Sequence, residues 1–329
     1  MMNRRVKMRR YFAVLGLSTL LLTGAPAHAE EAVLKGAMFI KSDKSLFRSV
    51  FNQFVERVNE TGKGLVRIDP VLGPEAIPSR EMPNALTEGV IDIAGLPPAY
   101  YRGIILEADA LQLASVPPAE QRKNGAIDYL QTRYNAAGWQ FLAQYGYGLQ
   151  FHLFLDEPIE TLADLKDFPL RTTPTYRHFF DALGARQVET SRGELYTAME
   201  RGVVNGYANA MSEVAPAGWD EVTKYRVDPG FYHAVVTITV NKERWDALSD
   251  EQKAVLSSAA EAVEMEMAPA MVAADQAEGQ KMVDKGMTVI TLSKDDAANL
   301  QDMALSAYWS LLEGENADSI GKLRPLLSE

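Results

Sequence analysis

The chain has 329 residues, of which 47% are hydrophobic; it contains no cysteine and carries a formal net charge of −11. This size and composition can build two ordinary domains, and the lack of cysteine excludes disulfides, zinc thiolate sites and cysteine nucleophiles. The acidic balance disfavours nucleic acid and anionic lipid as partners, but it does not exclude an anionic ligand, because a cleft sets its own local potential.

The first 29 residues predict a secretory signal peptide. They combine a basic head, an apolar stretch at 11–23 and a small-residue cleavage site at Ala27-His28-Ala29. The alternative is a membrane-spanning helix, but the stretch is shorter than the roughly 20 apolar residues that a bilayer requires. We therefore expect export across the inner membrane, and loss of the five basic residues of this segment would take the net charge to about −16.

Beyond this segment, strands and helices are predicted to alternate. Apolar residues at helical spacing predict a helix over 45–59, and alternating apolar and charged residues predict a strand over 65–69. The other elements predicted in the first half are strands at 31–40, 90–94, 139–143 and 149–155 and helices at 81–88 and 118–137. This order is typical of an α/β lobe with a mixed sheet.

The second half repeats the same order. It predicts strands at 170–172, 187–190, 203–209 and 288–291 and a helix at 176–183. A capping box, Ser191-Arg192-Gly193-Glu194, opens a helix that ends at Gly202. Ser249 opens the longest helix, which runs to about Lys285, and Ser293 caps a final helix through Leu312.

An internal repeat predicts two lobes of similar construction. Residues 85–94 and 198–207 share a helix end, a glycine and a β-branched pair, although any junction from helix through glycine to strand has this pattern. The longest helix would measure about 54 Å, so we expect it to bridge both lobes, with a kink at Pro269. We assign 30–152 with 242–283 to lobe 1, and 153–241 with 284–329 to lobe 2.

Motifs for catalysis are absent from the sequence. It has no phosphate-binding loop, no dinucleotide-binding glycine pattern, no H-E-x-x-H and no G-x-S-x-G. The histidines beyond the predicted signal peptide are His152, His178 and His233, which would have to converge from separate elements to form a metal or triad site. We therefore expect a protein that is not an enzyme and that uses no cofactor, and we assign no metal ligands; whether a bound cation assists the ligand is left open.

Arg171 is the residue that most strongly indicates a ligand. It lies in a short predicted strand between apolar and hydroxyl residues, shortly before Pro174. A guanidinium there needs an anion, and its fork matches a carboxylate in bidentate fashion. From the residues alone, an internal salt bridge to a carboxylate of the protein itself explains Arg171 as well as a ligand does.

A series of short motifs runs through residues 162–209. They are Asp164-Leu165-Lys166, Arg171, Leu183-Gly184-Ala185, Glu194-Leu195-Tyr196-Thr197-Ala198-Met199, Gly202-Val203-Val204-Asn205-Gly206 and Asn209. In order and spacing this series resembles the solute-binding proteins of tripartite ATP-independent periplasmic (TRAP) transporters, of the dicarboxylate-receptor (DctP-type) family. Similar segments at 221–225, 241–245 and 248–252 extend the resemblance over nearly the whole chain.

The resemblance implies a type II-like periplasmic binding protein fold, in which two lobes close over a ligand by hinge bending. It implies a periplasmic receptor that pairs the carboxylate of a small organic acid with Arg171 and adds a hydrogen bond from Asn209. Its partners would be the small and large integral membrane subunits that take up the ligand. Alternatives are a receptor for an ABC importer, a periplasmic enzyme on this fold and a sensory receptor.

Departures from the family pattern bear on the ligand. Asp167 replaces a glycine, and Gln150 stands where many members carry a second arginine. A neutral amide there favours a monocarboxylate with polar or ring substituents. Apolar residues occupy the odd positions of the 149–155 strand, so we expect Gln150 to face the cleft. Weaker candidates, each with core packing or solvent exposure as the alternative, are Lys41, Tyr100, Tyr145, Tyr147, Phe231 and His233.

Overall fold

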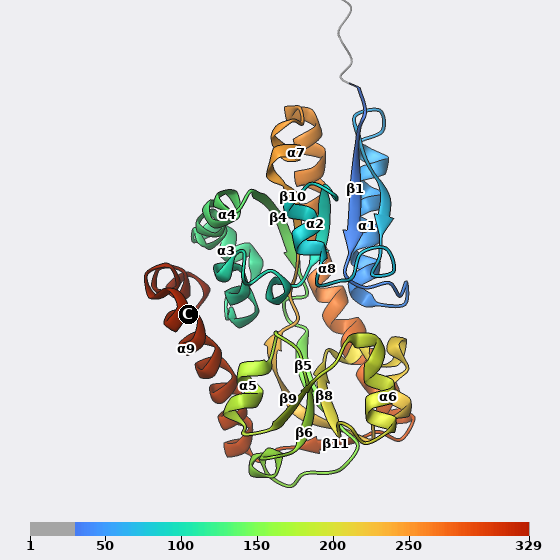
Figure 1. Cartoon of the computed structure of the whole chain (residues 1–329), viewed down its shortest axis with the longest axis vertical. Coiled ribbons are helices and arrows are strands. Elements are labelled where there is room, and N and C mark those ends of the chain that lie inside the picture. Colours follow the sequence, from blue (N-terminus) through green and yellow to red (C-terminus); the bar gives the residue numbers. More distant parts are fainter. Residues whose placement is uncertain (1–29, 329) are drawn as a thin grey trace, which may run out of the picture.

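Two separate β-sheets divide the molecule into two lobes. The computed structural model describes residues 30–328, so the predicted signal peptide lies outside the described residues. Sheet A occupies the upper half of Figure 1 and sheet B the lower half, and helices lie around both. Both sheets contain parallel and antiparallel pairs, which confirms the prediction of a two-lobed α/β fold with mixed sheets.

Sheet A has the strand order β2-β1-β3-β10-β4. β1 runs parallel to β2 and β3, whereas β10 runs antiparallel to β3 and β4. The bounds are β1 (Ala32–Met38), β2 (Val66–Leu72), β3 (Ile93–Leu96), β4 (Trp139–Tyr145) and β10 (Val236–Asn241). The parallel strands β1 and β3 therefore place their carboxyl ends on the same edge of the sheet.

Sheet B has the strand order β11-β9-β5-β8-β6-β7. β6 runs parallel to β7 and β8, whereas β5 runs antiparallel to β8 and β9. The bounds are β5 (Gln150–Leu155), β6 (Pro169–Thr172), β7 (Arg186–Glu189), β8 (Gly206–Asn209), β9 (Tyr225–His233) and β11 (Thr288–Thr291). The carboxyl ends of β6 and β8 thus share one edge, where open α/β sheets commonly bind ligands.

Helix α1 (Leu46–Thr61) covers sheet A. Ser45 caps it by accepting the N–H of Arg48, and its fully buried side chains include Phe51 and Phe54, which pack in the same core as Ile93 of β3. The shorter helices are α2 (Met82–Thr87), α3 (Pro118–Lys123), α4 (Ala126–Ala136), α5 (Arg177–Ala182), α6 (Leu195–Glu200) and α7 (Lys242–Asp246). The apolar residues that recur at helical spacing in 45–59 therefore form the helix face that packs on the sheet.

Helix α8 (Asp250–Asp284) bridges the lobes, as predicted, and runs from the upper to the lower half of Figure 1. In the first lobe Glu264 accepts from Arg122 and, at 2.9 Å, from the backbone N–H of Gln144. Towards the second lobe Asp275 accepts from the N–H of Ser212 at 2.7 Å. The helix continues through Pro269, and the capping box at Ser249 is present.

Helix α9 (Lys294–Leu327) also contacts both lobes. Tyr232 of β9 donates to the carbonyl of Ala304 at 2.6 Å, and the hydroxyls of Ser319 and Tyr129 of α4 lie 2.8 Å apart. Asn316, between these contacts, has non-helical backbone angles (φ −154°, ψ 80°). The predicted end at Leu312 was therefore too early: the helix bends at Asn316 and a further segment packs against the first lobe.

The two copies of the internal repeat have the same backbone geometry. Gly89 and Gly202 are left-handed (φ +70° and +65°), and the next residue, a valine in each case, donates to the carbonyl of Ala85 or Ala198 at 2.9 Å. Because these N–H groups close a helix end, the strands begin later than predicted, at Ile93 and Gly206. The single helix predicted over 118–137 was likewise wrong, since left-handed Gly125 separates α3 from α4.

The chain crosses between the sheets in two adjacent segments. Residues 146–149 join β4 to β5, and residues 234–235 join β9 to β10. The N–H of Ala234 donates to the carbonyl of Leu149 at 2.7 Å, so the crossings are bonded to each other. We propose these crossings as the hinge and as the lobe boundaries in place of the predicted 152/153 and 241/242, since β5 lies wholly in sheet B and β10 in sheet A.

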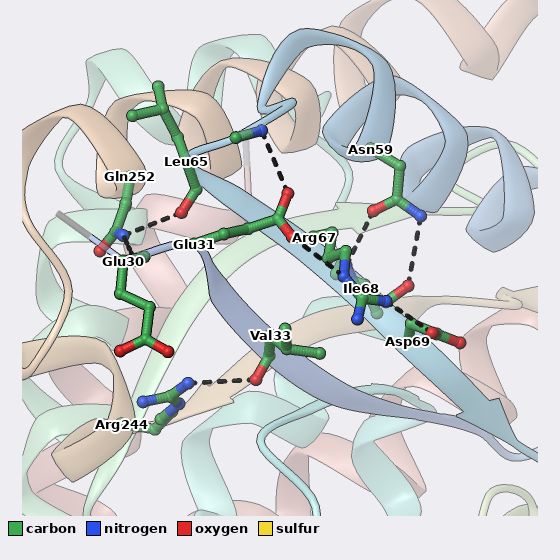
Figure 2. Close-up of polar contacts among 11 residues, drawn as sticks. Glu30, Glu31, Val33, Asn59, Leu65, Arg67, Ile68, Asp69, Arg244 and Gln252 are labelled. Carbon is green, nitrogen blue, oxygen red and sulfur yellow. Dashed lines mark hydrogen bonds and ion pairs between the residues drawn. The ribbon is translucent and has the colours of Figure 1, made fainter. Parts of the chain in front are cut away.

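Polar contacts fasten the start of β1, where the described chain begins (Figure 2). Glu31 accepts from Arg67 at 3.2 Å and from the N–H of Gly64 at 3.1 Å, and Gln252 donates to the carbonyl of Leu65 at 2.9 Å. Arg244 donates to the carbonyl of Val33 at 3.1 Å. Glu31 thus joins the start of β1 to β2, Gln252 of α8 holds the residue before β2, and Arg244 of α7 holds β1. Within residues 30–328, no helix combines the length and apolarity needed to cross a membrane.

Candidate functional site

A cavity lies between the lobes, at the carboxyl ends of β1, β3, β6 and β8. It contains about 580 Å³ of space not filled by protein atoms, part of it open to solvent. Its lining residues come from both lobes and from the second crossing: Phe39, Ile40, Phe47, Pro97, Tyr100, Phe151, Arg171, Thr173, Thr175, Tyr176, Arg192, Ala208, Asn209, Glu213, Ala234, Val235 and Val236. We call this cavity the interlobe cleft.

Arg171 enters the cleft from the middle of β6, and its exposed fraction is only 6%. Its Nε donates to the carbonyl of Thr190 at 3.2 Å, and one terminal nitrogen donates to the hydroxyl of Tyr176 at 2.8 Å. Neither partner is charged, and among residues 30–328 no carboxylate forms an ion pair with Arg171. The internal salt bridge that the sequence left open is therefore not what holds this guanidinium, which still has N–H groups to offer an anion.

Asn209 ends β8 beside Arg171's strand, and its exposed fraction is 8%. Its side-chain oxygen accepts from the N–H of Ala210 at 2.9 Å. The amide therefore turns its NH₂ group away from that backbone contact. An NH₂ group near a guanidinium presents a second donor to an anionic ligand.

Aromatic rings form much of the cleft wall. Phe39 packs against Phe47 and Tyr100 with ring centres 6.5 and 5.8 Å apart, and Phe151 packs against Tyr176 at 5.9 Å. Burial raises the pKa of Tyr100, while the nearby charges of Arg171, Arg192 and Arg80 act to lower it. The cleft therefore offers apolar, ring-lined walls around a small number of polar groups.

Arg192 and Glu213 form a second charged group in the cleft, and the sequence reasoning missed both. Arg192 follows the predicted capping residue Ser191, donates to Glu213 at 3.1 Å and stacks over the ring of Trp219 at 4.6 Å. Glu213 is fully buried and accepts from the Ser45 hydroxyl at 2.8 Å and from the N–H of Leu46 at 3.0 Å. Burial raises the pKa of Glu213, whereas Arg192 and Ser45 act to lower it.

Of the residues predicted for the ligand site, Arg171, Asn209 and Tyr100 line the interlobe cleft together. Gln150, Phe231 and His233 line a different cavity beside α9. The reason lies in strand alternation: adjacent residues face opposite sides, and it is Phe151, not Gln150, that faces the cleft. The polar face of β5 was therefore assigned to the wrong side.

The remaining candidates lie outside the cleft lining. Tyr145 is buried in the core of the first lobe and donates to the carbonyl of Phe47 at 3.2 Å. Tyr147 donates to the carbonyl of Ser115 at 2.8 Å and packs on His233 with ring centres 4.3 Å apart. Lys41 is exposed. Within the described chain, no group of three or more histidine, aspartate and glutamate side chains is arranged to hold a metal ion.

His233, the last residue of β9 before the second crossing, is expected to make stability depend on pH. Its Nδ1 accepts from the N–H of Gly148 at 3.1 Å, and burial lowers its pKa to about 4, against a weaker opposing effect of the Ala114 carbonyl. The unfolded chain takes up this proton near pH 6.5. The contribution of His233 to stability is therefore complete above pH 6.5 and is lost as the pH falls towards 4, by up to about 3 kcal/mol.

Urea unfolding of the wild-type protein and of His233→Gln at pH 7.5, 6.0, 5.0 and 4.2 measures this contribution. Other titrating groups are common to both proteins, so the difference between their unfolding free energies isolates His233. We expect that difference to shrink steadily below pH 6.5. A difference that does not change with pH would contradict the assignment.

Comparison with known proteins relates this architecture to a family. The family model described as bacterial extracellular solute-binding protein, family 7, matches residues 37–314. The 2,3-diketo-L-gulonate-binding periplasmic protein YiaO of Escherichia coli is 30% identical over 171 residues, covering 50% of this chain and 51% of YiaO. The chain spans about half the length of the curated relatives it matches.

Solved structures share the fold at low sequence identity. DctP7 of Bordetella pertussis, an extracytoplasmic solute receptor that binds pyroglutamic acid, has a TM-score of 0.80 and 17% identity, over 90% of this chain and 99% of that one. A TRAP periplasmic solute-binding protein of Desulfovibrio salexigens with bound orotic acid has a TM-score of 0.79 and 19% identity, over 90% and 97%. These matches agree with the two-lobed architecture described above.

Proposed function

The chain belongs to family 7 of the bacterial extracellular solute-binding proteins, and from this premise we propose that it is a receptor that binds a small organic acid with one carboxylate in the interlobe cleft. The carboxylate binds Arg171 as a bidentate partner, and Asn209 donates a further hydrogen bond. The aromatic walls contact the rest of the acid. The receptor captures and releases this ligand without changing it.

The observation that carries the proposal is the state of Arg171. A guanidinium with 6% exposure pays a large desolvation cost, and its contacts with Thr190 and Tyr176 supply no negative charge. A ligand carboxylate would supply that charge in a nearly dry site, where electrostatic attraction is strong. A receptor for an organic acid accounts for the neutral contacts of Arg171, because the counterion then arrives with the ligand.

Charge and shape support a monocarboxylate. Arg192 is paired with Glu213, so Arg171 provides the unmatched positive charge of the cleft lining. The rings of Phe39, Tyr100 and Phe151 suit a flat or cyclic body. Pyroglutamic, orotic and 2,3-diketo-L-gulonic acids, the ligands named for similar proteins, each carry a single carboxyl group.

Contacts between the lobes support closure over the ligand. Arg80 of the first lobe pairs with Glu189 of the second at 2.6 Å, and Glu213 of the second bonds the start of α1 in the first. Both contacts would break if the lobes opened about the crossings. We propose that the closed receptor works in the periplasm and delivers its ligand to the small and large membrane subunits of a TRAP transporter, as its family membership favours over an ABC importer.

Paired ligands test the function directly. In calorimetry and thermal unfolding, each acid is compared with its neutral amide: pyroglutamate with pyroglutamide, orotate with orotamide, and benzoate with benzamide. At 100 times its dissociation constant, a bound acid adds about 2.7 kcal/mol to stability, and we expect the amides to add none. Amides that bind as tightly as their acids would refute the carboxylate, and recovery of a chemically changed acid would refute a receptor.

A further inference from the structure

The interlobe cleft contains two guanidinium groups, and the protein treats them differently. Arg171 makes only neutral contacts, whereas Arg192 is held by the Glu213 carboxylate at 3.1 Å and by the ring of Trp219. Both arginines line the same cavity, and the charges of both act on the Tyr100 hydroxyl. A ligand bound at Arg171 therefore lies within the electrostatic range of Arg192 and Glu213.

Glu213 occupies a site made for an anion. One oxygen accepts from the Ser45 hydroxyl and from the N–H of Leu46, which are the cap and the first residue of the 16-residue helix α1, and the other accepts from Arg192. A helix N-terminus carries partial positive charge and free N–H donors. Together with a guanidinium across the lobe interface, it forms a second anion site in the cleft, separate from Arg171.

We propose that Glu213 sets the specificity of the receptor for acids with a single carboxylate, because its own carboxylate fills the second anion site and repels a second carboxylate of the ligand. The inference rests on the proposed binding of a carboxylate to Arg171. A dicarboxylate with one end on Arg171 would bring its other end to a cleft wall where a buried negative charge is already bonded three times. Neither charge could be neutralised by water there.

The fixed position of Glu213 is what makes it selective. The side chain is fully buried and bonded to both lobes, so it cannot turn aside for a ligand. Arg192 in turn is held on Trp219 and also donates to the backbone carbonyl of Glu213 at 3.2 Å. Removing the Glu213 carboxylate would leave the α1 N-terminus and Arg192 in place, facing an empty volume.

The test compares acids that differ only by a second carboxylate: 2-oxopentanoate with 2-oxoglutarate, and benzoate with isophthalate. Calorimetry gives the ratio of dissociation constants, dicarboxylate over monocarboxylate, for the wild-type protein, Glu213→Gln and Glu213→Ala. Any general loss of closure affects both acids and cancels in the ratio. We expect the ratio to fall at least tenfold in Glu213→Ala, which vacates the site, and less in Glu213→Gln, which removes only the charge.

The double variant Glu213→Ala with Arg192→Ala is the matched control, and it should lose most of the gain in dicarboxylate binding. Glu213→Gln keeps the volume and an acceptor for Ser45, so it remains informative if Glu213→Ala does not fold. A ratio within twofold of wild type in folded Glu213→Ala, or in Glu213→Gln if Glu213→Ala does not fold, would overturn this inference while leaving the proposed function standing. A wild-type protein that binds no monocarboxylate at all would instead overturn the proposed function.

Discussion

Replacing Arg171 by alanine is expected to weaken binding of the preferred organic acid about 30-fold or more. The guanidinium is nearly inaccessible, lies on a sheet strand and has no carboxylate partner within the described chain, so under the proposed function its remaining N–H groups bind the ligand. Truncation would leave the bound carboxylate desolvated and unpaired, which typically costs about 2–5 kcal/mol. Calorimetry with whichever acid of the acid–amide comparison binds the wild-type protein most tightly measures the loss.

Two further variants separate geometry from charge. Arg171→Lys keeps the positive charge but loses the planar fork, and we expect it to recover only a small part of the lost affinity. Arg57→Ala removes an arginine on α1 that pairs with Glu266 of α8, a half-exposed pair outside the cleft lining, and should bind within about twofold of wild type. If Arg171→Ala matched that control, the carboxylate would have to bind elsewhere.

The fold could largely be predicted because its signals are local. Apolar spacing at 45–59, the capping residues Ser249 and Ser293, and the glycines that end helices each report a structure formed by neighbouring residues. Errors arose where a hydrogen bond joins the residues after a helix-ending glycine back to that helix. The N–H groups after Gly89 and Gly202 bond back to the preceding helix, which delays β3 and β8 by about three residues beyond what β-branched residues indicate.

The site was only partly predictable, for the same reason. The family motif identifies Arg171 and Asn209. Glu213, in contrast, is placed by a hydrogen bond from Ser45, which lies 168 positions earlier in the chain. No local pattern marks such a contact. The one local signal nearby was the capping box at Ser191, the residue directly before Arg192. Gln150 shows the converse error. We expected this polar residue to face the cleft, but the apolar residue Phe151 on the opposite face of the same strand lines it.

The hinge depends on how closely the two crossings approach each other. Gly146 and Gly148 in the first crossing are both left-handed (φ +97° and +91°). The N–H of Gly148 donates to His233, and the N–H of Ala234 donates to Leu149. Ala234 and Val235 also line the cleft. The backbone of the proposed hinge therefore also lines the interlobe cleft, and we expect a disturbance of the crossings to weaken binding of a ligand there.

Gly146→Ala is accordingly expected to lower the unfolding free energy by about 2–5 kcal/mol, the sum of left-handed strain and overpacking. A Cβ at position 146 would collide with the carbonyl oxygen of Ala234 and lie 3.1 Å from the ring of Phe47, another cleft residue. Because the obstructing atom is backbone, relief requires the crossings to separate. We therefore also expect weaker ligand binding, measured by calorimetry at a temperature where the variant is folded.

Gly138→Ala provides the matched control for backbone strain alone. Gly138 is also left-handed (φ +77°), but a Cβ there would meet nothing within 4 Å. It should cost only about 1–2 kcal/mol and leave affinity unchanged, because Gly138 precedes β4 at the edge of the first lobe. Only Gly146→Ala disturbs the contact between the crossings. If the two variants had equal urea midpoints and equal affinities, that contact would contribute neither to stability nor to ligand binding.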